Sequence, residues 1–199
     1  MAVPSSQYLQ FGPEAKDYME GINVERLRRE RLSRTQARMK QEGIAASILA
    51  GPDFRYTTGL RTPMFVGHGA EQFAIVFAES DETVVFQQSQ HAKQNRLLAP
   101  WIKPENLRPV PFMMPGVGPD GMKVTGPKAA DMVFEALREK GVERELIATS
   151  TLHGPMRARL EERGVRLTPA GDFMNEVRMI KTTDEVNCLR WAGAMVDRA

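Results

Sequence analysis

The segment at residues 44–50 (IAASILA) constrains the fold more than any other part of the sequence. Its apolar residues fall on both faces of an extended chain, so a strand formed here has to be covered on both sides. The run stops at Gly51-Pro52, a pair that commonly ends a regular element. We therefore expect a β-strand enclosed between two layers of other elements.

Helical and strand patterns alternate along the rest of the chain. Helices are predicted at residues 24–42, 128–140, 155–163 and 173–180, and strands at residues 73–78, 83–86, 146–149 and 165–168. The strands at 73–78 and 83–86 flank a polar tetrapeptide and should form an antiparallel hairpin. This alternation predicts an α/β fold in which a mixed, partly antiparallel β-sheet is flanked by helices.

Local signals mark the ends of several of these elements. Asn23 can cap the helix at 24–42, and Gly43 can take the left-handed conformation after it. Asp53 is expected to cap a short turn that ends at Gly59, and Pro127 is expected to open the helix at 128–140. Each signal lies within a few residues of the end it marks.

The last segment starts a helix with a capping box, in which the Thr182 hydroxyl and the Glu185 carboxylate each bind the other residue's backbone amide. An apolar stripe continues to the last residues without a stop signal; it comprises Val186, Leu189, Gly193 and Val196. We therefore divide the chain into an extended arm (1–22), a central domain (23–175), and a linker with the first helix of a further domain (176–199).

Composition excludes several classes of partner and location. The 27 basic and 25 acidic residues leave a net charge of only +2, which predicts neither a nucleic-acid nor a membrane partner. The first twenty residues contain no apolar run as long as a signal peptide requires, and no part of the sequence has one as long as a membrane span. We therefore expect neither secretion nor membrane insertion. A single cysteine, Cys188, suits a reducing compartment, so we expect a cytoplasmic protein.

Three apparent functional patterns are better explained structurally. The G-x-G-x-x-G at residues 116–121 lacks a strand before it and sits among prolines, which predicts a mobile loop rather than a dinucleotide site. The arginine-rich run at 26–40 is interpreted as the solvated face of a helix, with Glu25 and Glu30 as i,i+4 partners. The histidines, at 68, 91 and 153, are too scattered for a local metal site, and no catalytic residue is predicted in this chain.

Two segments resemble the creatinase-type N-terminal domain of the pita-bread metalloenzymes, which include aminopeptidase P, prolidase and creatinase. In the first, residues 51–60 (GPDFRYTTGL) follow a helix and an apolar strand, and Tyr56 to Gly59 is similar to the family's Tyr-Leu-Thr-Gly with Thr57 in place of Leu. In the second, residues 176–190 (EVRMIKTTDEVNCLR) resemble the family's linker, with Lys181 and Glu185 at its characteristic positions.

The resemblance implies that catalysis belongs to a pita-bread domain that follows this segment. In the family a pair of divalent metal ions (Mn, Co or Zn) is held there by two Asp, one His and two Glu, so no metal or other cofactor is expected in this chain. The N-terminal domain packs on its own catalytic domain and supplies contacts for a homodimer or homotetramer. We expect the same partners here.

The resemblance also implies a role for the loop at residues 61–69, which reaches toward a neighbouring subunit's active site in the family. Arg61 would bind a substrate carboxylate, Phe65 would form an apolar wall and His68 would donate a hydrogen bond. The alternative interpretation of these residues is an ordinary flexible loop.

Three functions remain open from the sequence. The first is the non-catalytic N-terminal domain of a metal-dependent Xaa-Pro peptidase. The second is the same domain of a pita-bread enzyme that is not a peptidase, similar to creatinase or to the dimethylsulfoniopropionate lyases. The third is a stand-alone interaction module.

Overall fold

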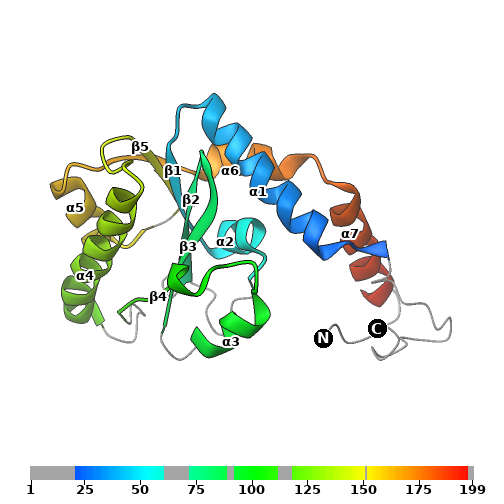
Figure 1. Cartoon of the computed structure of the whole chain (residues 1–199), viewed down its shortest axis with the longest axis horizontal. Helices are drawn as coiled ribbons and strands as arrows, with labels where there is room; N and C mark the ends of the chain where they lie inside the picture. Colours follow the sequence, from blue (N-terminus) through cyan, green and yellow to red (C-terminus); the bar gives the residue numbers. More distant parts are fainter. Residues whose placement is uncertain (1–20, 61–71, 89–91, 112–117, 151, 197–199) are drawn as a thin grey trace.

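A computed structural model describes residues 21–60, 72–88, 92–111, 118–150 and 152–196 of the 199-residue chain. A six-stranded sheet stands between two helical layers (Figure 1). In chain order, the elements are α1 (Val24–Gln41), β1 (Ala46–Ala50), α2 (Gly51–Thr58), β2 (Gln72–Phe77), β3 (Ser80–Gln87), α3 (Ala92–Leu98), the 3-10 helix η4 (Pro104–Asn106), β4 (Leu107–Pro109), α4 (Gly118–Glu139), β5 (Leu146–Thr149), α5 (Gly154–Glu162), β6 (Arg166–Pro169), α6 (Gly171–Met179) and α7 (Thr183–Val196). The predicted mixed α/β class is confirmed.

The strand order is β4-β3-β2-β1-β5-β6. β1 is parallel to β5, β5 to β6, and β3 to β4, whereas β2 is antiparallel to both of its neighbours. In the register, Ile48 of β1 lies opposite Ile75 of β2 on one side and Thr149 of β5 on the other. β2 therefore begins at the edge of the sheet where its neighbours β1 and β3 end.

β1 is buried along its whole length, as its sequence predicts. Successive side chains point to opposite faces, so Ile48 packs among residues of α4 and α5 while Leu49 packs among residues of α1, α2 and α6. A smaller cluster, which includes the fully buried Phe54, joins α2 to the segment around α3 and β4. The sheet thus has a buried apolar layer on each face.

The α4 helix begins at Gly118, which corrects two predictions. The last residues of the G-x-G-x-x-G pattern form the first turn of this helix and not a mobile loop, and Pro127 lies inside the helix rather than opening it. Pro119 is tolerated because the first helical amides have no partner within the helix. Gly126 has a packing role, since a Cβ there would lie 3.0 Å from the Cβ of Pro155 at the start of α5.

Other differences lie in short elements. α3, η4 and β4 were not predicted, and each has seven residues or fewer. Asp53 does not cap α2, because α2 starts at Gly51 and the Asp53 carboxylate instead accepts a hydrogen bond from the Ser150 hydroxyl. Nearly all of the predicted arm at residues 1–22 lies outside the described residues. None of the helices in the described ranges is long and apolar enough to cross a membrane.

Candidate functional site

The two sequence motifs meet where α1 crosses α2 and α7, a region we call the joint. Arg31 of α1 connects them: its guanidinium carbon lies 4.8 Å from the centre of the Tyr56 ring, and its Nε donates to Glu185 Oε1 at 2.9 Å. Figure 1 shows α1 running from the sheet toward α7. A single arginine therefore ties the Tyr-x-Thr-Gly turn to the linker.

Glu185 uses its second oxygen to start α7. Its Oε2 accepts from the Thr182 backbone amide at 2.8 Å, while the Thr182 hydroxyl accepts from the Glu185 amide at 3.2 Å. The predicted capping box is confirmed. Because one carboxylate serves both the cap and Arg31, the beginning of α7 is fixed in position against α1.

Asp184 forms the second contact of the joint. Its side chain is 0% exposed, and Arg26 donates to it from Nε at 2.7 Å and from Nη2 at 2.9 Å. The backbone amide of Asn23, at the start of α1, donates to the same carboxylate at 2.9 Å. The Arg26 hydrogen bond, with the Asn23 amide in support, holds the pKa of Asp184 below its ordinary value.

A third set of contacts anchors the linker to α2. Arg178 lies 3.0 Å from the Asp53 carboxylate at the start of α2, and the Tyr56 hydroxyl donates to the Val177 carbonyl at 3.4 Å. Burial raises the pKa of Tyr56, so the hydroxyl keeps its proton at neutral pH. Lys181 donates to the carbonyls of Arg178 and Met179 at the end of α6.

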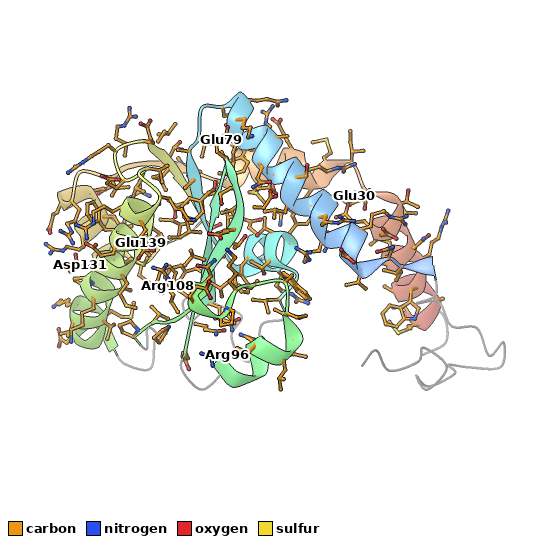
Figure 2. All side chains as sticks on the ribbon, viewed as in Figure 1. Glu30, Glu79, Arg96, Arg108, Asp131 and Glu139 are labelled. Atoms are coloured by element: carbon orange, nitrogen blue, oxygen red, sulfur yellow. The ribbon has the colours of Figure 1, made fainter. Side chains whose placement is uncertain are left out.

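The arginine face of α1 is thus largely an internal interface and not the solvated face that was predicted. Arg34 donates to the Ile180 carbonyl at 2.6 Å, and Arg38 lies 2.7 Å from Glu176. Of the predicted i,i+4 partners, Glu25 lies 3.8 Å from Arg29. Glu30 acts by charge on Arg26, four residues before it, and makes no ion pair with a described residue. Figure 2, in which Glu30 is labelled, shows the side chains that fill the angle between α1 and α7.

Gly59 ends α2 with a φ of 71°, a left-handed conformation that favours glycine. The next residue, Leu60, is buried in the cluster around Phe54. Beside this turn the Trp101 indole donates to the Thr58 carbonyl at 3.0 Å. The element thus ends at Gly59, as the sequence predicts, but it is the helix α2 and not only a short turn.

Comparison with known proteins supports the fold. No family profile and no curated protein sequence matches the chain. The prolidase from Thermococcus sibiricus has a similar structure at 18% identity and a TM-score of 0.58, with 86% of this chain and 42% of that chain covered. The dipeptidase from Pyrococcus horikoshii OT3 also has a similar structure, at 22% identity and a TM-score of 0.51, with 76% of this chain and 37% of that chain covered.

The chain is also similar to a solved structure that consists of one domain only. The Creatine_N superfamily domain of a dipeptidase from Streptococcus thermophilus is 14% identical with a TM-score of 0.50, covering 73% of this chain and 96% of that domain. The chain has the creatinase N-terminal fold. It spans about two fifths of the length of the prolidase and dipeptidase chains that it matches.

Within this creatinase N-terminal fold, the whole of the predicted substrate loop at residues 61–69 lies outside the described residues. Arg61, Phe65 and His68 lie outside the described residues, so their roles stay predictions. The described residues that flank it are Leu60, after α2, and Gln72, the first residue of β2. That residue lies at the edge where β1 and β3 end.

The part of the chain that the structure describes contains no group of three or more His, Cys, Asp or Glu side chains that could hold a metal ion. His153, the one histidine in the described ranges, precedes α5. Cys188 is a half-buried free thiol whose pKa is raised by burial, which disfavours the reactive thiolate. The charged residues of the joint connect α1 to α7 and α2 to α6.

Proposed function

We propose that this chain is the non-catalytic N-terminal domain of a metal-dependent Xaa-Pro peptidase. One observation carries the proposal: the same fold covers 96% of a single dipeptidase domain but only 42% of a whole prolidase chain. The match in size and shape to a single dipeptidase domain supports a place as one domain of a larger enzyme. In this proposal a Mn, Co or Zn pair is held by the catalytic domain that α7 leads into.

The joint has a function in this arrangement. α7 is attached to α1 by Asp184 and Glu185, and the linker before it is attached to α2 by Arg178. Ion pairs with fixed hydrogen-bond directions restrict the angle between two helices more than an apolar contact does, because apolar surfaces can slide over each other. The joint would thus orient the catalytic domain relative to the sheet.

A direct test is to express the coding sequence together with whatever follows Ala199, beside a form that ends at Ala199. We expect the longer product, supplied with Mn²⁺, Co²⁺ or Zn²⁺, to hydrolyse Xaa-Pro dipeptides and the short form to be inert. A longer product that turns over only a non-peptide substrate would favour the creatinase-like or lyase-like alternative. A reading frame that stops at Ala199 would favour the interaction module and contradict the peptidase.

The role of the loop is a further part of the proposal. In the active longer product, Arg61→Ala or His68→Ala should lower kcat/KM by roughly ten- to a hundredfold, the value of one charge-assisted hydrogen bond. Arg29→Ala, an exposed arginine on α1, is the matched control and should leave kcat/KM unchanged. Unchanged kinetics in both loop variants would show that the loop is a bystander.

Self-association is the last part of the proposal. Leu189, Met195 and Val196 of α7 are 58%, 43% and 74% exposed, so the chain presents an apolar face that a second copy could cover. We expect sedimentation to show dimers or tetramers, which Leu189→Glu would dissociate. A monomer at high concentration would contradict this part alone.

A further inference from the structure

A hollow of about 280 Å³ lies beside the Gly59 turn, between α1, the end of α2, the start of β3 and the segment around η4. Trp101 and Ile102 line one part of it, and Thr57 and Thr58 line another. Its volume approaches the lower limit of sites that bind small molecules. It is separate from the joint, whose ion pairs do not line it.

Arg28 is a cation in this hollow that makes no ion pair with the described residues, although Glu25 acts on it by charge from the preceding turn of α1. Its guanidinium carbon lies 5.1 Å from the centre of the Trp101 ring, and partial burial lowers its pKa from the ordinary value. No carboxylate or carbonyl of the described residues accepts a hydrogen bond from it, although Arg26 and Arg31 on the same helix each hold a carboxylate. A half-buried guanidinium stacked on an indole has its hydrogen-bonding edge free for a ligand carboxylate.

Asp81 is the unmatched anion of the same hollow. It lines the hollow from the start of β3 and makes no ion pair or hydrogen bond with a described residue. The neighbouring Glu82 is already engaged by Lys103 and by Lys140, which together lower the pKa of Glu82 to about 2. The free charges of the hollow are thus one cation and one anion, on separate elements and unpaired with each other.

We propose that this hollow binds a small zwitterion, an α-amino acid or a dipeptide, with its carboxylate on Arg28, its ammonium group toward Asp81 and its side chain against Trp101 and Ile102. The hollow thus offers each charge of such a ligand an opposite charge and its side chain an apolar surface, in a volume of about 280 Å³. The inference does not depend on the peptidase proposal, since it rests on the hollow alone.

The test uses the full chain with Trp191→Phe, so that Trp101 is the remaining tryptophan. Leucine, N-acetyl-leucine and leucinamide are titrated while the fluorescence of Trp101 and the NMR shift of its indole N–H are followed. Leucine should bind with a dissociation constant on the order of millimolar, N-acetyl-leucine several-fold more weakly and leucinamide most weakly, because a few contacts at a partly open site give this affinity.

Variants assign the two charges. Arg28→Met, which keeps the apolar stem over Trp101, should weaken leucine binding by about tenfold or more. Asp81→Asn should weaken leucine binding by about two- to fivefold and leave N-acetyl-leucine unaffected, because an exposed charge contributes less. Arg29→Met is the matched control on the same helix and should change nothing.

Three results would overturn the proposal. They are a spectrum in which neither signal moves with any ligand up to tens of millimolar, equal affinity for leucine in the Arg28→Met variant, and equal affinity for leucine and N-acetyl-leucine. Circular dichroism of each variant verifies that it is folded before titration.

Discussion

The sheet and the joint of this domain are stabilised by opposite means. In the sheet, Ile48, Ile75 and Phe86 are fully buried among apolar side chains, and Phe73 stacks on Phe86 at 5.0 Å between ring centres. In the joint, the buried groups are two carboxylates, each held by an arginine. Burial of apolar surface depends little on direction or pH, whereas a carboxylate and a guanidinium interact only in one geometry and one protonation state.

The difference separates stability from orientation. The sheet keeps the domain folded, and the joint decides where α7 points. If this division is correct, changes in the sheet should unfold the whole domain, and changes in the joint should release α7 alone. The following predictions test it in order of decreasing effect.

Phe86→Ala should destabilise the whole domain. It removes a fully buried ring from β3, which typically costs about 3–5 kcal/mol of the free energy of unfolding. Urea denaturation followed by circular dichroism measures the loss. Leu97→Ala on α3, where the side chain is 76% exposed, is the control and should change the value by less than about 0.5 kcal/mol. Equal effects of the two would mean that the sheet is not the stabilising core.

Asp184→Asn should release α7 without unfolding the sheet. The substitution keeps the shape but removes the charge that Arg26 and the Asn23 amide both bind. Hydrogen exchange should become faster by about tenfold or more in α7 and stay unchanged in β1 and β5. Glu79→Gln, which breaks an exposed pair with Lys40, is the control. Equal acceleration in β1 and α7 would contradict a separable joint.

Acid should have the same local effect. The pKa of Asp184 is lower in the folded protein than in an unfolded chain, so its stabilisation is complete above the ordinary carboxyl pKa of about 3.9 and is lost as the pH falls through the folded value. Exchange in α7, corrected for the intrinsic rate, should be flat from about pH 7 to 5 and rise below about pH 4. The Asp184→Asn variant should lack that rise, and an identical profile in both proteins would exclude Asp184 as its cause.

Tyr56→Phe should have the smallest effect. The hydroxyl makes one long hydrogen bond, 3.4 Å to the Val177 carbonyl, while the ring under Arg31 is retained. We expect a loss below about 1 kcal/mol in thermal unfolding. Tyr56→Leu also removes the ring beneath Arg31 and should cost more. A Phe variant as unstable as the Leu variant would assign the contribution to the hydroxyl.

The elements predicted from sequence are those whose signals are local. The Asn23 side chain accepts from the Arg26 amide, as expected of a cap, and Gly43 and Gly59 take the left-handed conformations expected of helix ends. The capping box at Thr182 and Glu185 is confirmed for the same reason. Each of these features is specified by residues that lie within a turn of one another.

The joint could not be predicted because its partners are far apart in the sequence. Arg26 and Asp184 are separated by 158 residues, and nothing in the arginine-rich run distinguishes a buried partner from solvent. The start of α4 was missed for another reason: proline and glycine at residues 119, 126 and 127 are helix breakers in general and are accommodated here by position and by packing against α5. The roles of Arg61, Phe65 and His68 stay predictions.

The long sequence separation between Arg26 and Asp184 also determines when their ion pair can form during protein synthesis. α1 leaves the ribosome early, but the carboxylate that completes its first turns is 158 residues behind it. At ordinary elongation rates that delay is roughly 8 to 30 s, far longer than a helix needs to form. During that interval Arg26 lacks its carboxylate partner, so the first turns of α1 are completed only after the start of α7 has been synthesised.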